Sequence, residues 1–217
     1  RHPQLVRRIV DAGHELASHG HGHQRATELD RDAFMQDITR AKGLLEDLGG
    51  RPVLGYRAPS FSIGRDNLWA FESLERAGHR YSSSIYPIHH DHYGMPEAPR
   101  FAHPVHGDLL EVPATTLRVF ERNLPSSGGG YFRLLPYPLS RWMIRRVNVA
   151  DGQAAVFYFH PWEIDPEQPR VPGIDAKTRF RHYVNIGRTE QRLARLLRGM
   201  ASRLASSSAA MALRKLT

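Results

Sequence analysis

Apolar residues recur at helical spacing in several segments of the chain. The first segment covers residues 3–12 and is followed by Gly13, which is suited to end a helix. Asp30 can cap a second helix, in which apolar positions continue from residue 33 until Gly49 and Gly50. The same spacing predicts three further helices, over residues 67–77, 139–147 and 189–200.

Short apolar segments between these helices predict strands. They are residues 15–18, 53–56, 81–85, 109–112, 116–120 and 154–159. The last is continuously apolar, as expected of a strand buried on both faces. Residues 87–104 indicate a long loop, and residues 126–130 a flexible one. Alternating strands and helices predict a parallel α/β sheet or barrel, and we expect an α/β barrel that lacks its first strand or strands.

One domain is expected over residues 1–199, followed by a disordered basic tail at residues 200–217. The chain has 217 residues, of which 41% are hydrophobic and 24% charged, as is ordinary for a soluble globular protein. No apolar run is long enough to span a membrane, and no signal segment opens the chain. Because the sequence does not begin with Met, we expect a fragment, and its start gives no indication of the compartment.

The absence of cysteine excludes disulfides, thiolate metal sites and a cysteine nucleophile. Any metal ion must therefore be held by His, Asp or Glu, a donor set that suits zinc and also cobalt, nickel or iron. The net charge of +8 would suit a basic module that binds a polyanion without catalysis, which is one alternative. Its basic residues are scattered, however, and aromatic residues do not alternate with them, so we do not expect nucleic acid as a partner.

Ser18-His19-Gly20-His21-Gly22-His23 follows the first predicted strand. His19 and His23 can converge on one metal ion, and the glycines allow the backbone to approach it closely. His21 points elsewhere in that geometry. Two ligands fall short of the three protein ligands usual for catalytic zinc, and the same residues also suit a polar surface loop.

Two other polar clusters follow predicted strands. Arg57 can hold a carboxylate bidentately or form a structural ion pair. His160 ends the apolar run before Trp162 and suits acid–base chemistry near neutral pH, or a bond to a backbone carbonyl. Glu163 is expected at the solvated rim. Because strand C-terminal ends share one face of a barrel, the three clusters are expected to meet there.

The combination of these segments resembles the polysaccharide deacetylase family, which shares the NodB homology domain. The resemblance is carried by Ser18-His19…His23, by Gly55-Tyr56-Arg57-Ala58-Pro59-Ser60-Phe61-Ser62-Ile63, and by Phe157-Tyr158-Phe159-His160-Pro161-Trp162-Glu163. Gly-Gly-Gly-Tyr-Phe at residues 128–132 and Arg181-His182-Tyr183 are similar to a branch found in bacterial exopolysaccharide loci with exosortase (PEP-CTERM) systems.

The resemblance implies a metal-dependent N-deacetylase on a distorted (β/α) barrel, acting on an N-acetylated polysaccharide. His19 and His23 match the metal-binding pair, and the implied divalent cofactor is zinc before other metals. His160 matches the general acid, and Arg57 matches the arginine that positions a catalytic aspartate. Pro59 and Phe61 match groove-wall positions.

Two further residues are candidates for substrate contact. Tyr131 can stack on a sugar, or it can belong to a plain flexible loop. Trp162 can form a wall of the acetyl pocket, or it can pack at the mouth of the barrel.

The sequence departs from the family pattern at its carboxylates. The family's paired aspartates belong to a motif upstream of residue 3, and Asp11 is the only aspartate before His19. Ser82 stands where relatives often carry Asp. We therefore expect this chain alone to be inactive and to bind metal weakly. A related barrel hydrolase acting on a small amide or a peptidoglycan sugar is the second alternative, to be distinguished by the groove near Phe61 and Tyr131.

Overall fold

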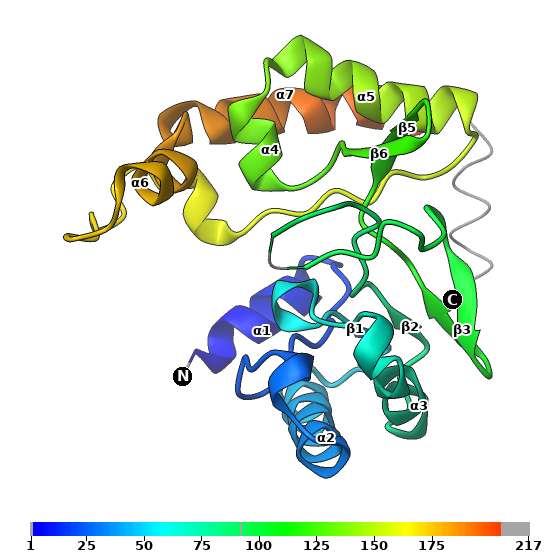
Figure 1. Cartoon of the computed structure of the whole chain (residues 1–217). Coiled ribbons are helices and arrows are strands. Elements are labelled where there is room, and N and C mark those ends of the chain that lie inside the picture. The colour runs from blue at the N-terminus through cyan, green and yellow to red at the C-terminus, as the bar shows by residue number, and fades with distance from the viewer. Residues whose placement is uncertain (1, 92, 205–217) are drawn as a thin grey trace. The chain divides into compact units, whose positions relative to one another are not determined.

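The computed structural model describes residues 2–91 and 93–204 (Figure 1). The chain divides into two compact units. The first unit comprises Arg1–Ala114 and Glu121–Asn123, and the second comprises Thr115–Phe120 and Leu124–Thr217.

The first unit contains helices α1 (Pro3–Asp11), α2 (Arg31–Gly49) and α3 (Trp69–Arg76). Helix α2 begins where the Asp30 carboxylate accepts a hydrogen bond from the Ala33 amide at 2.8 Å. It ends at Gly50, whose left-handed φ of 63° lets its amide donate to the Glu46 carbonyl. The cap and the stop of this helix are confirmed.

The sheet of the first unit has the strand order β1-β2-β4-β3. Its strands are β1 (Gly55–Tyr56), β2 (Tyr81–Ser82), β3 (His103–His106) and β4 (Leu109–Glu111). β1, β2 and β4 are parallel neighbours, whereas β3 pairs with β4 antiparallel. Ser18 adds a parallel bridge on the free side of β1, opposite Tyr56. The predicted strand at residues 15–18 is thus reduced to one bridging residue, and β3 begins within the predicted loop 87–104.

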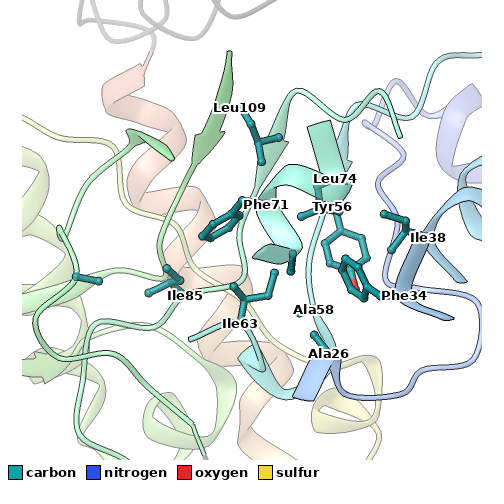
Figure 2. Packing of buried hydrophobic residues seen from close by; sticks show 12 residues of the cluster. Ala26, Phe34, Ile38, Tyr56, Ala58, Ile63, Phe71, Leu74, Ile85 and Leu109 are labelled. Carbon is teal, nitrogen blue, oxygen red and sulfur yellow. The ribbon is translucent and has the colours of Figure 1, made fainter. Parts of the chain in front are cut away.

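The core of this unit lies between α2, α3 and the sheet. Phe34 and Ile38 of α2 point into a buried cluster, where the Phe34 ring meets the Tyr56 ring edge-on at 5.9 Å (Figure 2). Phe71 and Leu74 come from α3 into the same cluster. The middle of each predicted apolar face is therefore buried, whereas Leu44 and Leu68, which were predicted on the same faces, are 51% and 43% exposed.

The second unit contains four helices and a two-stranded sheet among its described residues. They are β5 (Thr116–Val119), β6 (Arg122–Pro125, shared with the first unit), α4 (Gly129–Leu134), α5 (Tyr137–Ala150), α6 (Ala176–Tyr183) and α7 (Ile186–Leu204). A second core cluster joins Phe132 of α4, Ile144 of α5, and Leu193 and Leu196 of α7. Within the described residues, no helix is both long and apolar enough to cross a membrane.

Two predictions for the second unit are wrong, and one extends beyond the described residues. Residues 154–159 form no strand and are only partly covered, with Phe159 39% exposed. Residues 126–130 are not a loose loop, because Ser126 to Gly129 are buried and Gly129 begins α4. Helix α7 continues to Leu204, and the rest of the predicted tail lies outside the described residues.

Candidate active site

The histidine segment and Arg57 leave adjacent parallel strands of the first unit. Ser18 donates its amide to the Gly55 carbonyl and accepts the Arg57 amide at its own carbonyl, each at 2.9 Å. His19 and Arg57 therefore follow neighbouring strand positions and turn out at the same edge of the sheet. The sequence correctly predicted that these two clusters meet.

The rings of His19 and His23 lie together, with centroids 5.0 Å apart and planes at 78°. The Nδ1 atom of His19 is 2.7 Å from the Arg57 carbonyl oxygen. Because a carbonyl only accepts, Nδ1–H is the donor in this bond. Both rings are on the exposed side of the unit, as a site that admits substrate requires.

The number of metal-ligating side chains here is small. Among residues 2–91 and 93–204, no group of three or more His, Asp or Glu side chains is close enough to hold a metal ion. His19 and His23 thus fit two positions of a zinc coordination sphere, and the chemistry of neutral imidazoles suits that metal. Further ligands would have to be water or groups other than these.

Arg57 is held by the segment that follows β2. Its Nε donates to the Ser83 carbonyl at 2.8 Å, and its Nη2 donates to the Ser83 hydroxyl at 2.6 Å. The Ala58 amide donates to the Ser84 hydroxyl, which in turn accepts from Ser82 at 2.8 Å. Ser82 is fully buried, so the position where a relative's aspartate was expected is a link in a hydroxyl network.

This serine segment is anchored by Glu111, a residue that the sequence analysis missed. The Oε1 atom of Glu111 accepts the amides of Ser84 and Ile85, each at 2.8 Å. Burial raises the pKa of Glu111 to about 7, against the opposing effects of Ser82, the two amides and the charge on Arg57. In the sequence, Glu111 is a lone carboxylate in the apolar segment Leu-Leu-Glu-Val. That pattern indicates a buried strand but does not predict that the carboxylate binds backbone amides.

Pro59 and Phe61 form a short 3-10 turn directly after Arg57, and both are buried. The Arg57 guanidinium lies over the Phe61 ring at 5.4 Å. Phe61 also lines a cavity of about 460 Å³ whose rim includes Arg25, Arg65 and Tyr93. Phe61 thus borders a cavity that is also lined by Arg25, two residues after His23 in the sequence.

His160 belongs to the second unit, where Glu163 is its partner. Glu163 accepts the His160 amide at 2.7 Å, and His160 Nδ1 lies 3.3 Å from the same carboxylate oxygen. Glu163 is 1% exposed, so the prediction that it lies at a solvated rim is wrong.

Glu163 also forms a buried ion pair with Arg133. The two side chains form an ion pair at 3.1 Å in which both are 2% exposed. Although burial raises the pKa of Glu163, the hydrogen bonds from His160 and the charge of Arg133 hold it below its usual value. Arg133 is fixed in turn by the carbonyls of His182 and Val184.

The glycine segment and the His160 segment interlock. A Cβ at Gly129 would lie 2.1 Å from a Glu163 carboxylate oxygen, and one at Gly128 would lie 2.8 Å from the Tyr158 ring. These glycines therefore serve close packing rather than flexibility. Tyr131 is partly exposed on α4, and Trp162 stacks on His182 at 4.2 Å.

The fold agrees with comparisons to known proteins. Residues 1–81 match the polysaccharide deacetylase family, and residues 83–209 match the domain of unknown function DUF3473. Because the second match covers more than half of the chain, the chain belongs to the DUF3473 family. Its first part, residues 1–81, is similar to the polysaccharide deacetylases.

Individual relatives are similar over limited regions. The peptidoglycan deacetylase-like protein FGM2 of Gibberella zeae is 35% identical over 83 residues, which are 38% of this chain and 24% of that protein. A putative polysaccharide deacetylase from Mycobacterium smegmatis has a TM-score of 0.50 at 24% identity, covering 75% of this chain and 55% of the other. The Puue allantoinase structure has a TM-score of 0.55 at 15% identity, covering 93% and 58%.

The chain thus spans about a quarter of that curated relative and somewhat more than half of these solved structures. The structural likenesses show the fold, and the predicted fold class, an α/β fold of the deacetylase barrel type, is confirmed.

Proposed function

We propose that this chain is part of a metal-dependent enzyme that removes N-acetyl groups from a polysaccharide. The observation that carries the proposal is the pairing of His19 with His23 at the strand end next to Arg57. The match of residues 1–81 to the polysaccharide deacetylases supports this reading over the polyanion-binding alternative. Assignment to the exosortase-associated branch stays a prediction.

His19 and His23 would hold the divalent metal ion, for which we propose zinc. When bound, the ion supplies a Lewis acid that activates water and polarises the acetamide carbonyl. His19 is prepared for this role, since its Nδ1–H is taken by the Arg57 carbonyl. The two imidazoles contribute no negative charge, so we expect weak binding by this chain alone.

His160 acts as the general acid that protonates the departing amine nitrogen. The support is its carboxylate partner Glu163, which lies against Nδ1 and orients the ring. Arg57 would orient a carboxylate, as the family resemblance implies, from a guanidinium already fixed by Ser83.

Sugar contacts are proposed for three aromatic residues and for Pro59. Phe61 borders the cavity of about 460 Å³, which supports a role in the wall of a binding groove, with Pro59 beside it. Tyr131 and Trp162 offer partly exposed rings on the second unit, as carbohydrate contacts require.

The proposal is tested by titrating the chain with zinc chloride and measuring heat. We expect saturable one-to-one binding, which His19→Ala and His23→Ala each abolish because one imidazole cannot retain the ion. His21→Ala is the matched control, since the side chain of His21 is exposed and its bond to Asp37 is made by the backbone amide, which the substitution keeps. Unchanged binding in both ligand variants would exclude the site.

The same samples are then incubated with a chitin oligomer and assayed for acetate. We expect no turnover by this chain, because its only aspartate before His19 is Asp11, which lies at the exposed end of α1. Robust turnover with zinc would show that the paired aspartates of the family are not needed.

A further inference from the structure

The carboxylate of Asp37 holds two of the three residues that separate the paired histidines. Its Oδ2 accepts the His21 amide at 3.0 Å, and its Oδ1 accepts the Gly22 amide at 2.7 Å. Asp37 is in helix α2, next to Ile38 and three residues after Phe34, both of which point into the core (Figure 2). The Asp37 side chain therefore attaches the histidine loop to helix α2, in addition to the bonds that Ser18 and His19 make with residues 55–57.

The loop would be hard to maintain without this attachment. His23 has a left-handed φ of 54°, a conformation that costs a non-glycine residue energy. Gly20 has a φ of 78°, and a Cβ there would lie 2.7 Å from the Asp37 carboxylate. The backbone is thus bent tightly around the carboxylate, and hydrogen bonds to a charged acceptor are stronger than neutral ones.

We propose that Asp37 is a positioning residue for the metal-binding pair, acting mainly on His23. His19 has an anchor of its own in the Arg57 carbonyl, whereas the direction in which the chain reaches His23 is set by the two amides on Asp37. The inference rests on the proposed function as far as the metal is concerned. Ordering the loop in advance removes an entropy cost that would otherwise fall on metal binding.

The first test is zinc chloride titration of the full chain and its variants. We expect Asp37→Ala to weaken zinc affinity about 10- to 100-fold, as is typical when a group that orients a ligand is lost. Asp37→Asn keeps one acceptor oxygen, so its zinc affinity should lie between those of Asp37→Ala and the unchanged chain. Asp47→Asn, an exposed aspartate of the same helix, is the matched control and should bind as the unchanged chain does.

The second test needs no metal. In NMR spectra of the metal-free chain, Asp37→Ala should shift or broaden the imidazole signals of His23 while those of His19 keep their positions. A general loss of structure would move both rings equally and would overturn the assignment. If Asp37→Ala does not fold, Asp37→Asn is judged by the same two readouts.

The outcomes separate the two proposals. If the unchanged chain does not bind zinc but His23 alone is displaced in the Asp37 variant, the metal proposal fails and the positioning role stands. If zinc binds and the Asp37 variants bind within twofold of the unchanged chain, the positioning role is wrong while the metal site stands.

Discussion

Two buried ionisable groups of the first unit should give opposite pH dependences of stability. Glu111 is fully buried, and its Oε2 has no hydrogen-bond partner among the described residues. His79 is 2% exposed, and both of its ring nitrogens are likewise without partners there. Burial raises the pKa of Glu111 to about 7, and burial followed by the charge of Lys42 lowers the pKa of His79 to about 4, against Glu46. Each group is thus held in its neutral form.

The sign and the size follow from these pKa values. Between pH 4.5 and about 7 the folded state binds the Glu111 proton more tightly than the unfolded chain, so stability falls as pH rises. Between pH 6.5 and about 4 the unfolded chain binds the His79 proton more tightly, so stability falls as pH drops. At about 1.4 kcal/mol per pKa unit, each effect amounts to about 3 kcal/mol. The two nearly cancel in the range where they overlap.

Single substitutions should reveal each effect. In Glu111→Gln, the free energy of unfolding should decrease by about 3 kcal/mol more than in the unchanged chain on acidification from pH 7 to 4.5. In His79→Phe, it should increase by a similar amount relative to the unchanged chain on acidification from pH 6.5 to 4. The double variant should follow the unchanged chain to within about 1 kcal/mol, since other titrating groups are common to all four proteins.

The assay is urea unfolding followed by the fluorescence of Trp69, in a background of Trp142→Phe and Trp162→Phe so that only the first unit is observed. Each variant is compared with the background protein at every pH. Parallel stability profiles in all four proteins would refute the reasoning, because neither group would then differ in proton affinity between the folded and unfolded states.

Two further predictions concern the second unit. Gly129→Ala should lower the free energy of unfolding by about 1–3 kcal/mol, measured by thermal unfolding, because its Cβ would collide with the Glu163 carboxylate. Gly130→Ala is the control and should not lower it, since the space around its Cβ is open. Equal effects of the two substitutions would contradict this explanation. Arg133→Met should cost about 3–5 kcal/mol in urea unfolding by leaving Glu163 buried without its cation. Adding Glu163→Leu should recover part of that loss, and no recovery would mean that the buried charge is not the cause.

The sequence predicted the parts of the fold that local signals determine. The cap at Asp30, the stop at Gly50 and the buried face of α2 were readable because capping chemistry and helical spacing act over a few residues. The failures have a common cause. Residues 154–159 are apolar enough for a central strand but do not pair as one, and strand pairing depends on distant partners that periodicity does not reveal.

The candidate site divides in the same way. That His19, His23 and Arg57 lie close together could be predicted, because metal-ligand spacing and strand ends are visible in the sequence, and their roles stay predictions. The roles of Asp37 and Glu111 and the burial of Glu163 could not be predicted. Asp37 and Glu111 bind backbone amides far from them in the sequence, and Glu163 is buried in an ion pair with a distant arginine. A carboxylate that binds backbone amides has no sequence motif of its own.

The attachment of the histidine segment through Ser18 has a consequence for its dynamics. Among the described residues, Ser18 alone of this segment pairs with the sheet, by two backbone bonds, and the histidine loop is otherwise held by the His19–Arg57 bond and by Asp37. Residues 13–25 can therefore detach in a local opening that leaves the hydrophobic cluster intact, at a free energy well below that of global unfolding. In such an opened population the two imidazoles are separated and could not share an ion. A bound ion would therefore deplete the opened population by mass action, so amide exchange in this segment should be slowest when metal is present.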